Sequence, residues 1–196
     1  MEIQLIASTN KLKDTKDMKK FSRDCARVCY TSKDFEQLRE EVADTKLTDR
    51  LLRSGHHSVF EHINLTFYMK NIPKIFAMIL NNEKQYATSE KSARYTQMKT
   101  TIPLQKEKYN KWMKILIPKI NEVFPKIKKG RDEVIKKLAQ ENARYMTSVF
   151  TPTKMVHTVN LRQLNFIMQG FEENIIKYRE NKNPFFNRLP ESLGQF

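Results

Sequence analysis

The chain has 196 residues and a formal net charge of +14, from 36 Lys and Arg residues against 22 Asp and Glu residues. No apolar run reaches the roughly eighteen residues that a membrane span needs, and the N-terminus lacks the basic and apolar segments of a secretory signal. Two cysteines are too few for a disulfide framework, so we expect a reduced, cytoplasmic protein with no membrane partner. The length allows one domain of ordinary size or two very small ones, and we expect a single domain over residues 1–196.

The excess positive charge predicts an anionic partner, such as a nucleotide, a phosphorylated cofactor, a nucleic acid or an acidic membrane. Part of this charge is concentrated, because residues 105–140 contain eleven Lys and Arg residues but four Asp and Glu residues. The charge alone does not choose among these partners.

The first elements in chain order are a short strand and a helix. Residues 3–7 are typical of a strand because they are apolar and partly β-branched. Apolar residues at helical spacing predict a helix over about 16–30, which places Cys25 and Cys29 on its buried face. Ser32 can cap a second helix, with Phe35, Leu38 and Val42 along one side.

After a third predicted helix, the spacing of apolar residues changes from that of a helix to that of a strand. That helix contains Leu47 and Leu51, and Gly55 suits its C-terminal stop. Residues 63–70 then alternate between apolar and polar side chains, which predicts a strand with one buried face. Pro73 suits the first turn of the next helix.

The second half of the chain is predicted to be mostly helical. Residues 81–98 are polar with little periodicity, whereas basic amphipathic helices are expected over about 106–124 and 131–145. Pro118 should kink or divide the first of these two helices. The last expected elements are a strand at 153–160, a helix near 161–179, and a turn-rich tail that is either an irregular closing segment or the cut end of a longer chain. The pattern indicates a helix-rich α/β or α+β domain around a small mixed or antiparallel sheet.

Three of the four histidines lie in the segment GHHSVFEH, residues 55–62. Their spacing is not the HExxH spacing that puts two zinc ligands on one helix face, so we expect no metal site. Two interpretations stay open. The histidines and Glu61 can hydrogen-bond to backbone groups, or Ser58 and Glu61 can form the polar rim of a site for an aromatic ligand.

Two further segments can carry chemistry. Ser89, Glu90, Ser92, Arg94 and Tyr95 crowd into residues 89–95, which suits either phosphate binding or a capped surface turn. Further on, the cationic and amide side chains of Arg144, Asn160 and Arg162 stand among apolar neighbours. An arginine beside a core points either to a ligand anion or to an internal carboxylate partner.

Taken together and in this order, these segments resemble the flavin-dependent (alternative) thymidylate synthases. The resemblance covers about residues 1–170 and rests on five stretches: ARVCYTS (26–32), GHHSVFEHINLTF (55–67), SEKSARY (89–95), NAR (142–144) and TVNLR (158–162).

The resemblance implies an enzyme that methylates dUMP to dTMP, with methylenetetrahydrofolate as carbon donor and with FAD reduced by NADPH. It also implies a homotetramer with its sites between subunits. Since dUMP, FAD and folate are all anions, the charge of +14 agrees with these partners. A nucleic acid is then an unlikely partner.

Site residues follow from the resemblance position by position. It assigns catalytic roles to His56 and Arg94, with His56 lining the flavin and folate cleft. It assigns dUMP binding to Glu90, Ser92, Ala93, Arg94 and Arg144, and FAD binding to Ser58, Glu61, Asn82, Glu83, Lys84, Asn160 and Arg162.

The chain departs from the family pattern at several positions. Asn82, Glu83 and Lys84 replace an Arg-His-Arg motif, Ala93 replaces a glycine, and Phe171 replaces an arginine that contacts dUMP. These departures indicate a divergent branch. Two alternatives are a homologue that binds nucleotide or flavin without synthase activity, and a nucleic-acid-binding protein that uses the basic helices over 106–137. No recognised nucleic-acid-binding motif supports the second alternative.

Overall fold

The computed structural model describes residues 1–42, 44–83, 85–97, 99, 102–125 and 130–179. The chain forms two compact units. Unit 1 contains residues 1–2, 69–80 and the described part of 89–155, and unit 2 contains the described part of 3–68, 81–88 and 156–179.

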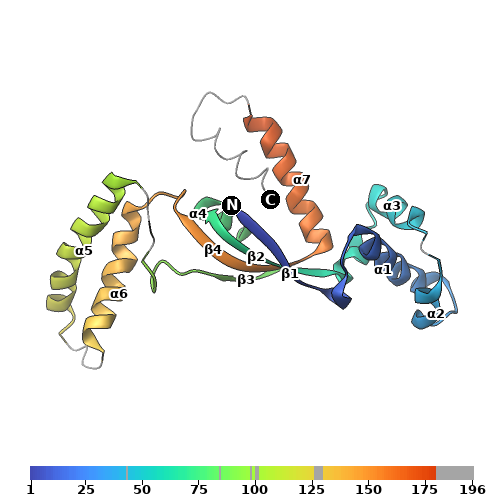
Figure 1. Ribbon diagram of the computed structural model, residues 1–196, viewed down its shortest axis with the longest axis horizontal. Helices are drawn as coiled ribbons and strands as arrows, with labels where there is room; N and C mark the ends of the chain where they lie inside the picture. Colours follow the sequence, from blue (N-terminus) through green and yellow to red (C-terminus); the bar gives the residue numbers. More distant parts are fainter. Residues whose placement is uncertain (43, 84, 98, 100–101, 126–129, 180–196) are drawn as a thin grey trace. The chain divides into compact units, whose positions relative to one another are not determined.

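A sheet of four strands runs in the order β1 (Glu2–Ser8), β2 (Asn64–Pro73), β4 (Pro152–Asn160) and β3 (Tyr86–Glu90) (Figure 1). Backbone N–H groups donate from Leu161 to Ile63 and from Lys74 to Thr151, so β2 and β4 run antiparallel. The predicted strands β1, β2 and β4 are confirmed, as is the helix-rich α+β class with a small antiparallel sheet. Sequence analysis missed β3 because this edge strand is polar and lacks apolar alternation.

Unit 2 contains four α-helices and three 3₁₀ turns among its described residues. The helices are α1 (Thr15–Arg27), α2 (Phe35–Glu40), α3 (Lys46–Arg53) and α7 (Leu161–Tyr178), and the 3₁₀ turns are η1 (Thr9–Lys11), η2 (Val28–Tyr30) and η3 (His57–His62). The prediction of Ser32 as a cap is wrong, because Asp34 caps α2 through a capping box with Gln37. Since α2 ends at Glu40, Val42 lies beyond it and is exposed. Gly55 has φ +77°, as a helix stop requires.

Unit 1 contains α4 (Lys74–Leu80), α5 (Pro103–Val123), α6 (Arg131–Ala143) and the 3₁₀ turn η4 (Arg144–Met146). Helices α5 and α6 lie side by side as a hairpin (Figure 1). Tyr109 on α5 and Ile135 and Ala139 on α6 are buried. Helix α5 continues through Pro118 and is not divided there.

The buried face of α1 differs from the predicted one. Cys29 is exposed and Cys25 is half-buried, whereas the side chains of Arg23 and Asp24 are each only 3% exposed. Arg23 donates to Asp24 Oδ1 from Nη2 at 2.5 Å and from Nε at 2.9 Å. It also donates to the carbonyl oxygens of Leu38 and Val42 at 3.1 and 2.6 Å. This network ties α1 to the segment of α2.

His157 on β4 is fully buried in unit 2. Its ring stacks on Tyr86 with centroids 5.2 Å apart, and neither ring nitrogen has a hydrogen-bond partner among the described residues. Burial lowers the pKa of His157 below its ordinary value of 6.5, because the charged imidazolium would lose its hydration. The imidazole of His157 therefore binds a proton more readily in the unfolded chain than in the folded chain.

The pH dependence of stability should reflect this buried histidine. Below pH 6.5, the free energy of unfolding should fall by up to about 1.4 kcal/mol per pH unit, until the pH passes the lowered pKa of the folded state. Urea unfolding at pH 5.5, 6.5 and 7.5 would measure this slope in the wild type and in His157→Phe, which keeps an aromatic ring against Tyr86. An equal slope in both proteins would contradict the assignment.

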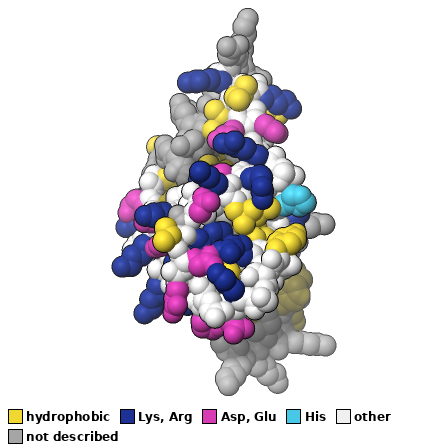
Figure 2. Space-filling model, turned by 90° about the vertical axis from the view of Figure 1, so that its right-hand side faces the viewer, with side chains coloured by type: hydrophobic (Ala, Val, Ile, Leu, Met, Phe, Trp, Pro, Cys, Tyr) yellow, Lys and Arg dark blue, Asp and Glu magenta, His cyan; other side chains and the backbone are white. Residues whose placement is uncertain are grey.

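Among the described residues, no helix combines the length and apolarity needed to cross a bilayer. Figure 2 shows one face of the molecule, on which Lys and Arg side chains are interspersed with Asp and Glu side chains. The positive charge on this face is therefore not gathered into a field of a single sign.

Candidate functional site

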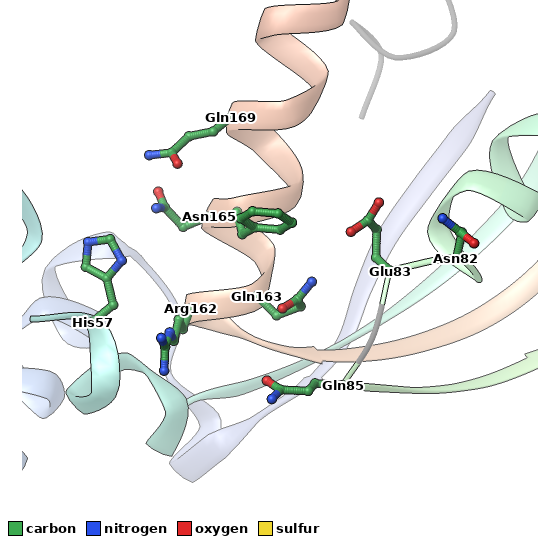
Figure 3. A pocket seen from close by; sticks show the side chains of 9 residues that line it. His57, Asn82, Glu83, Gln85, Arg162, Gln163, Asn165 and Gln169 are labelled. Atoms are coloured by element: carbon green, nitrogen blue, oxygen red, sulfur yellow. The ribbon is translucent and has the colours of Figure 1, made fainter. Parts of the chain in front are cut away.

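A pocket of about 540 Å³ in unit 2 is lined by side chains from η3, from α7 and from Asn82, Glu83 and Gln85 (Figure 3). Five of its described lining residues are carboxamides, and we therefore call it the amide pocket. Its lining residues are His57, Asn82, Glu83, Gln85, Arg162, Gln163, Asn165, Phe166 and Gln169. It brings together Asn82, Glu83 and Arg162, which the resemblance assigns to FAD.

Helix α7 presents one polar face to this pocket and an apolar face to the core. Its lining residues, between Arg162 and Gln169, recur at helical spacing on one side, while Ile167 and Phe171 are buried on the other. In Figure 3, Asn165 and Gln169 project from α7 on the side where His57 lies. Asn160 fixes the start of the helix, because its side chain accepts a hydrogen bond from the backbone N–H of Gln163 at 2.8 Å.

An ion pair links the two helical elements beside the amide pocket. Arg162 on α7 donates to Glu61 on η3, and the two side chains are 50% and 41% exposed. The ring of His57 is held by a hydrogen bond between its Nε2 and the Leu52 carbonyl oxygen, 2.9 Å apart. Element η3 thus positions both the carboxylate that pairs with Arg162 and an imidazole of the pocket wall.

The loop that carries Asn82 and Glu83 is closed at its two ends. The hydroxyl of Tyr86 donates to the Asn81 carbonyl oxygen at 2.5 Å, and the Tyr86 ring stacks on the buried His157. Lys84, which the resemblance also assigns to FAD, lies outside the described residues.

The other residues predicted in segment 55–62 do not line the amide pocket. His56 is exposed at the position that precedes η3, and Ser58 is exposed within η3. In the part of the chain that the structure describes, no three His, Cys, Asp or Glu side chains gather in a way that could hold a metal ion.

A second pocket, of about 480 Å³, lies in unit 1, and we call it the arginine pocket. Its lining residues are Lys74, Met78, Ala93, Arg144, Tyr145, Thr147, Ser148, Val149 and Thr151. It brings together Ala93 and Arg144, which the resemblance assigns to dUMP. The Arg144 guanidinium lies over the Tyr145 ring, 5.5 Å from its centroid.

Glu90 adjoins the arginine pocket through an ion pair. Lys74 Nζ lies 2.5 Å from Glu90 Oε1, and the Thr153 hydroxyl donates to the same oxygen at 3.4 Å. Ser92 belongs to a turn, because its carbonyl oxygen accepts from the N–H and the hydroxyl of Thr96. Arg94 does not line the pocket. Its guanidinium is largely exposed and lies 3.7 Å from Glu141 of α6.

Sequence analysis did not single out several of the lining residues. In the amide pocket these are Gln85, Gln163, Asn165, Phe166 and Gln169, and in the arginine pocket the main one is Lys74. A signal existed for α7, since Arg162, Asn165, Phe166 and Gln169 recur at the spacing of one helix face. Phe171, at the position where the family has an arginine, is buried.

The fold is similar to that of solved thymidylate synthases. A structure of thymidylate synthase X from Helicobacter pylori with FAD and dUMP superposes with a TM-score of 0.54 at 18% identity, over 100% of this chain and 92% of that chain. A UMP/dUMP methylase from Streptomyces cacaoi, bound with 5-Br dUMP, superposes with a TM-score of 0.53 at 20% identity, over 85% of this chain and 76% of that chain. The architecture is therefore of the thymidylate synthase X class.

Sequence comparison identifies the family. The sequence model of the family described as "Thymidylate synthase complementing protein" matches residues 11–170, and the chain belongs to this family. The flavin-dependent thymidylate synthase of Pyrococcus furiosus is 25% identical over 146 residues, which are 69% of this chain and 57% of that protein. That of Pseudothermotoga lettingae is 32% identical over 138 residues, which are 65% of this chain and 62% of that protein. The chain thus spans about three fifths of the length of these relatives.

Proposed function

We propose that this chain is a flavin-dependent thymidylate synthase. The proposed reaction is the methylation of dUMP to dTMP, with methylenetetrahydrofolate as carbon donor, FAD as cofactor and NADPH as reductant. The observation that carries the proposal is the meeting of Asn82, Glu83 and Arg162, from two distant segments of the chain, in one pocket. The names of the relatives agree with this reaction.

The residues of the amide pocket suit the ring system of a flavin. A flavin ring has a flat apolar body and a polar edge that carries both donors and acceptors. Carboxamide side chains supply both kinds of group, and the aromatic ring of Phe166 is 60% exposed for stacking. When bound, the flavin would supply the hydride and mediate the one-carbon transfer, while the side chains bind and orient it.

The arginine pocket suits a nucleotide monophosphate. Arg144 can present a two-pronged fork of donors to the phosphate, and Ala93 has a small side chain that lets a ligand approach the backbone. Glu90 can accept a hydrogen bond from the base or the sugar. Ser92 and Arg94 stay proposed dUMP ligands. To bind dUMP, the guanidinium of Arg94 has to give up its ion pair with Glu141. Breaking an exposed ion pair costs only about 0–1 kcal/mol.

We also propose a catalytic role for His56 beside the flavin and folate, a homotetramer with sites between subunits, and a cytoplasmic location. Exposed apolar side chains on α5 support an assembly, because apolar surface of this kind is typical of subunit contacts. They include Trp112, Ile115, Ile117 and Val123.

The visible absorption spectrum of the purified protein tests the proposed function. FAD is added, excess is removed, and the spectrum is recorded before and after addition of dUMP. A retained flavin band that dUMP perturbs, followed by formation of dTMP in a methylation assay, is the expected result. A protein that retains no flavin would instead be a nucleotide-binding homologue or a nucleic-acid-binding protein, and binding to DNA or RNA that falls steeply with salt would identify the latter.

Arg162→Ala should weaken flavin binding by about 10-fold, because the pocket loses a charged donor whose strength is reduced by solvent exposure. The matched control is Arg179→Ala, which removes the same side chain just beyond the end of α7 and outside the amide pocket. Flavin retention after gel filtration measures both variants. If wild type and Arg162→Ala retain equal amounts of flavin, Arg162 does not bind the flavin.

A further inference from the structure

The arginine pocket of unit 1 has a second cation in its wall besides Arg144. This cation is Lys74, and none of the described lining residues is Asp or Glu. The undescribed positions nearest to the lining residues in sequence are not acidic either, since they are Lys84, Met98, Thr100 and Thr101. Neither the sequence patterns nor the family resemblance assigns a role to Lys74.

The backbone at Lys74 is fastened to the opposite wall of the same pocket. Lys74 is the first residue of α4, and its N–H donates to the Thr151 carbonyl oxygen at 3.0 Å. The N–H of Ile75 donates to the Val149 carbonyl oxygen at 2.7 Å. Because Val149 and Thr151 also line the pocket, the Lys74 side chain starts from a fixed point of the wall. A ligand that binds Lys74 therefore does not have to order this part of the backbone.

The ammonium group of Lys74 is directed by its ion pair with Glu90. The side chains of Lys74 and Glu90 are 32% and 13% exposed, so the pair is partly buried. An ammonium group has more than one N–H donor, and the contact with Glu90 Oε1 engages one of them. Counted together, Lys74, Arg144 and Glu90 still leave a net positive charge.

We propose that Lys74 binds the phosphate of the nucleotide together with Arg144, while Glu90 faces the sugar or the base. A phosphate is the part of a nucleotide that needs two cations, because the sugar and the uracil ring are neutral. Lys74 thus makes the pocket select a nucleotide over a nucleoside. This inference rests on the proposed function, to which it adds a phosphate ligand.

The test has to separate Lys74 from its partner. Loss of Lys74 alone would leave the Glu90 carboxylate unpaired, and that carboxylate would itself repel a phosphate. We therefore compare Glu90→Gln with the double variant Lys74→Met, Glu90→Gln, since both lack the carboxylate and they differ only at residue 74. Isothermal titration calorimetry with dUMP should show about 10-fold weaker binding by the double variant. Equal dUMP affinity in the two proteins would overturn the inference.

Deoxyuridine, which lacks the phosphate, shows which part of the nucleotide Lys74 contacts. Ligand-observed NMR, which reaches millimolar dissociation constants, should give the same deoxyuridine affinity for Glu90→Gln and the double variant. If deoxyuridine and dUMP lose affinity by the same factor, Lys74 acts on the sugar or the base and the inference is wrong. The control Lys114→Met removes an exposed cation of α5 outside the pocket and should leave dUMP binding unchanged.

Failure of this inference is distinguishable from failure of the proposed function. A wild-type chain that does not bind dUMP refutes both. A wild-type chain that binds dUMP, while the two variants bind it equally, refutes the role of Lys74 and leaves the proposed function standing.

Discussion

Replacement of Arg144 by alanine is expected to weaken dUMP binding by about 10- to 150-fold, which corresponds to the roughly 1.5–3 kcal/mol of a hydrogen bond to a charged group. The reason is that Arg144 lines the arginine pocket and stacks on Tyr145, so its planar donors are held in place for a phosphate. Isothermal titration calorimetry with dUMP measures the change in the dissociation constant.

Two control variants accompany this measurement. Arg144→Lys keeps the charge but loses the two-pronged geometry, so its affinity should lie between those of wild type and alanine. Lys111→Ala removes an exposed cation of α5 outside the pocket and should leave dUMP binding unchanged. If Arg144→Ala binds dUMP like the wild type, the arginine pocket is not the substrate site.

Replacement of Asp24 by asparagine is expected to lower the free energy of unfolding by about 3–5 kcal/mol. The substitution keeps the size of the side chain but leaves the guanidinium of Arg23 buried without its carboxylate. Chemical denaturation at neutral pH, with the slope against denaturant checked for constancy, gives the change in stability.

The matched comparison is the exposed ion pair of Lys19 and Asp49, which are 37% and 38% exposed and 2.6 Å apart. Asp49→Asn should cost only about 0–1 kcal/mol, since water solvates both partners. Similar losses of stability in Asp24→Asn and Asp49→Asn would show that burial does not determine how much the Arg23–Asp24 ion pair contributes to the free energy of unfolding.

Much of the fold could be predicted because apolar periodicity reports burial directly. The alternation at 63–70 gives β2, and the helical spacing after Asn160 gives α7. Apolar periodicity fails to predict burial where the buried side chains are polar or charged. Arg23 and Asp24 are buried because they satisfy one another, so a search for apolar side chains places the cysteines on that face instead.

The candidate sites were less accessible to sequence analysis. Arg162 was singled out as an arginine among apolar neighbours, but its link to Asn82 and Glu83 came from the family resemblance, since no spacing rule joins segments so far apart. The spacing of Asn165 and Gln169 with Arg162 marks one face of α7, but it does not tell a pocket wall from a solvent face, because Asn and Gln are ordinary on either. Lys74 was missed for a different reason, since its ion pair with Glu90 depends on how the chain folds back on itself.

The contacts of Tyr86 have a consequence for substitutions in the wall of the amide pocket. The hydrogen bond from the Tyr86 hydroxyl to the Asn81 carbonyl oxygen and the stacking on His157 set the span of this loop without using the side chains of Asn82 or Glu83. The loop geometry and the loop chemistry are therefore separate properties. Substitution of Asn82 or Glu83 can therefore change the chemistry of the pocket wall while the contacts of Tyr86 are kept.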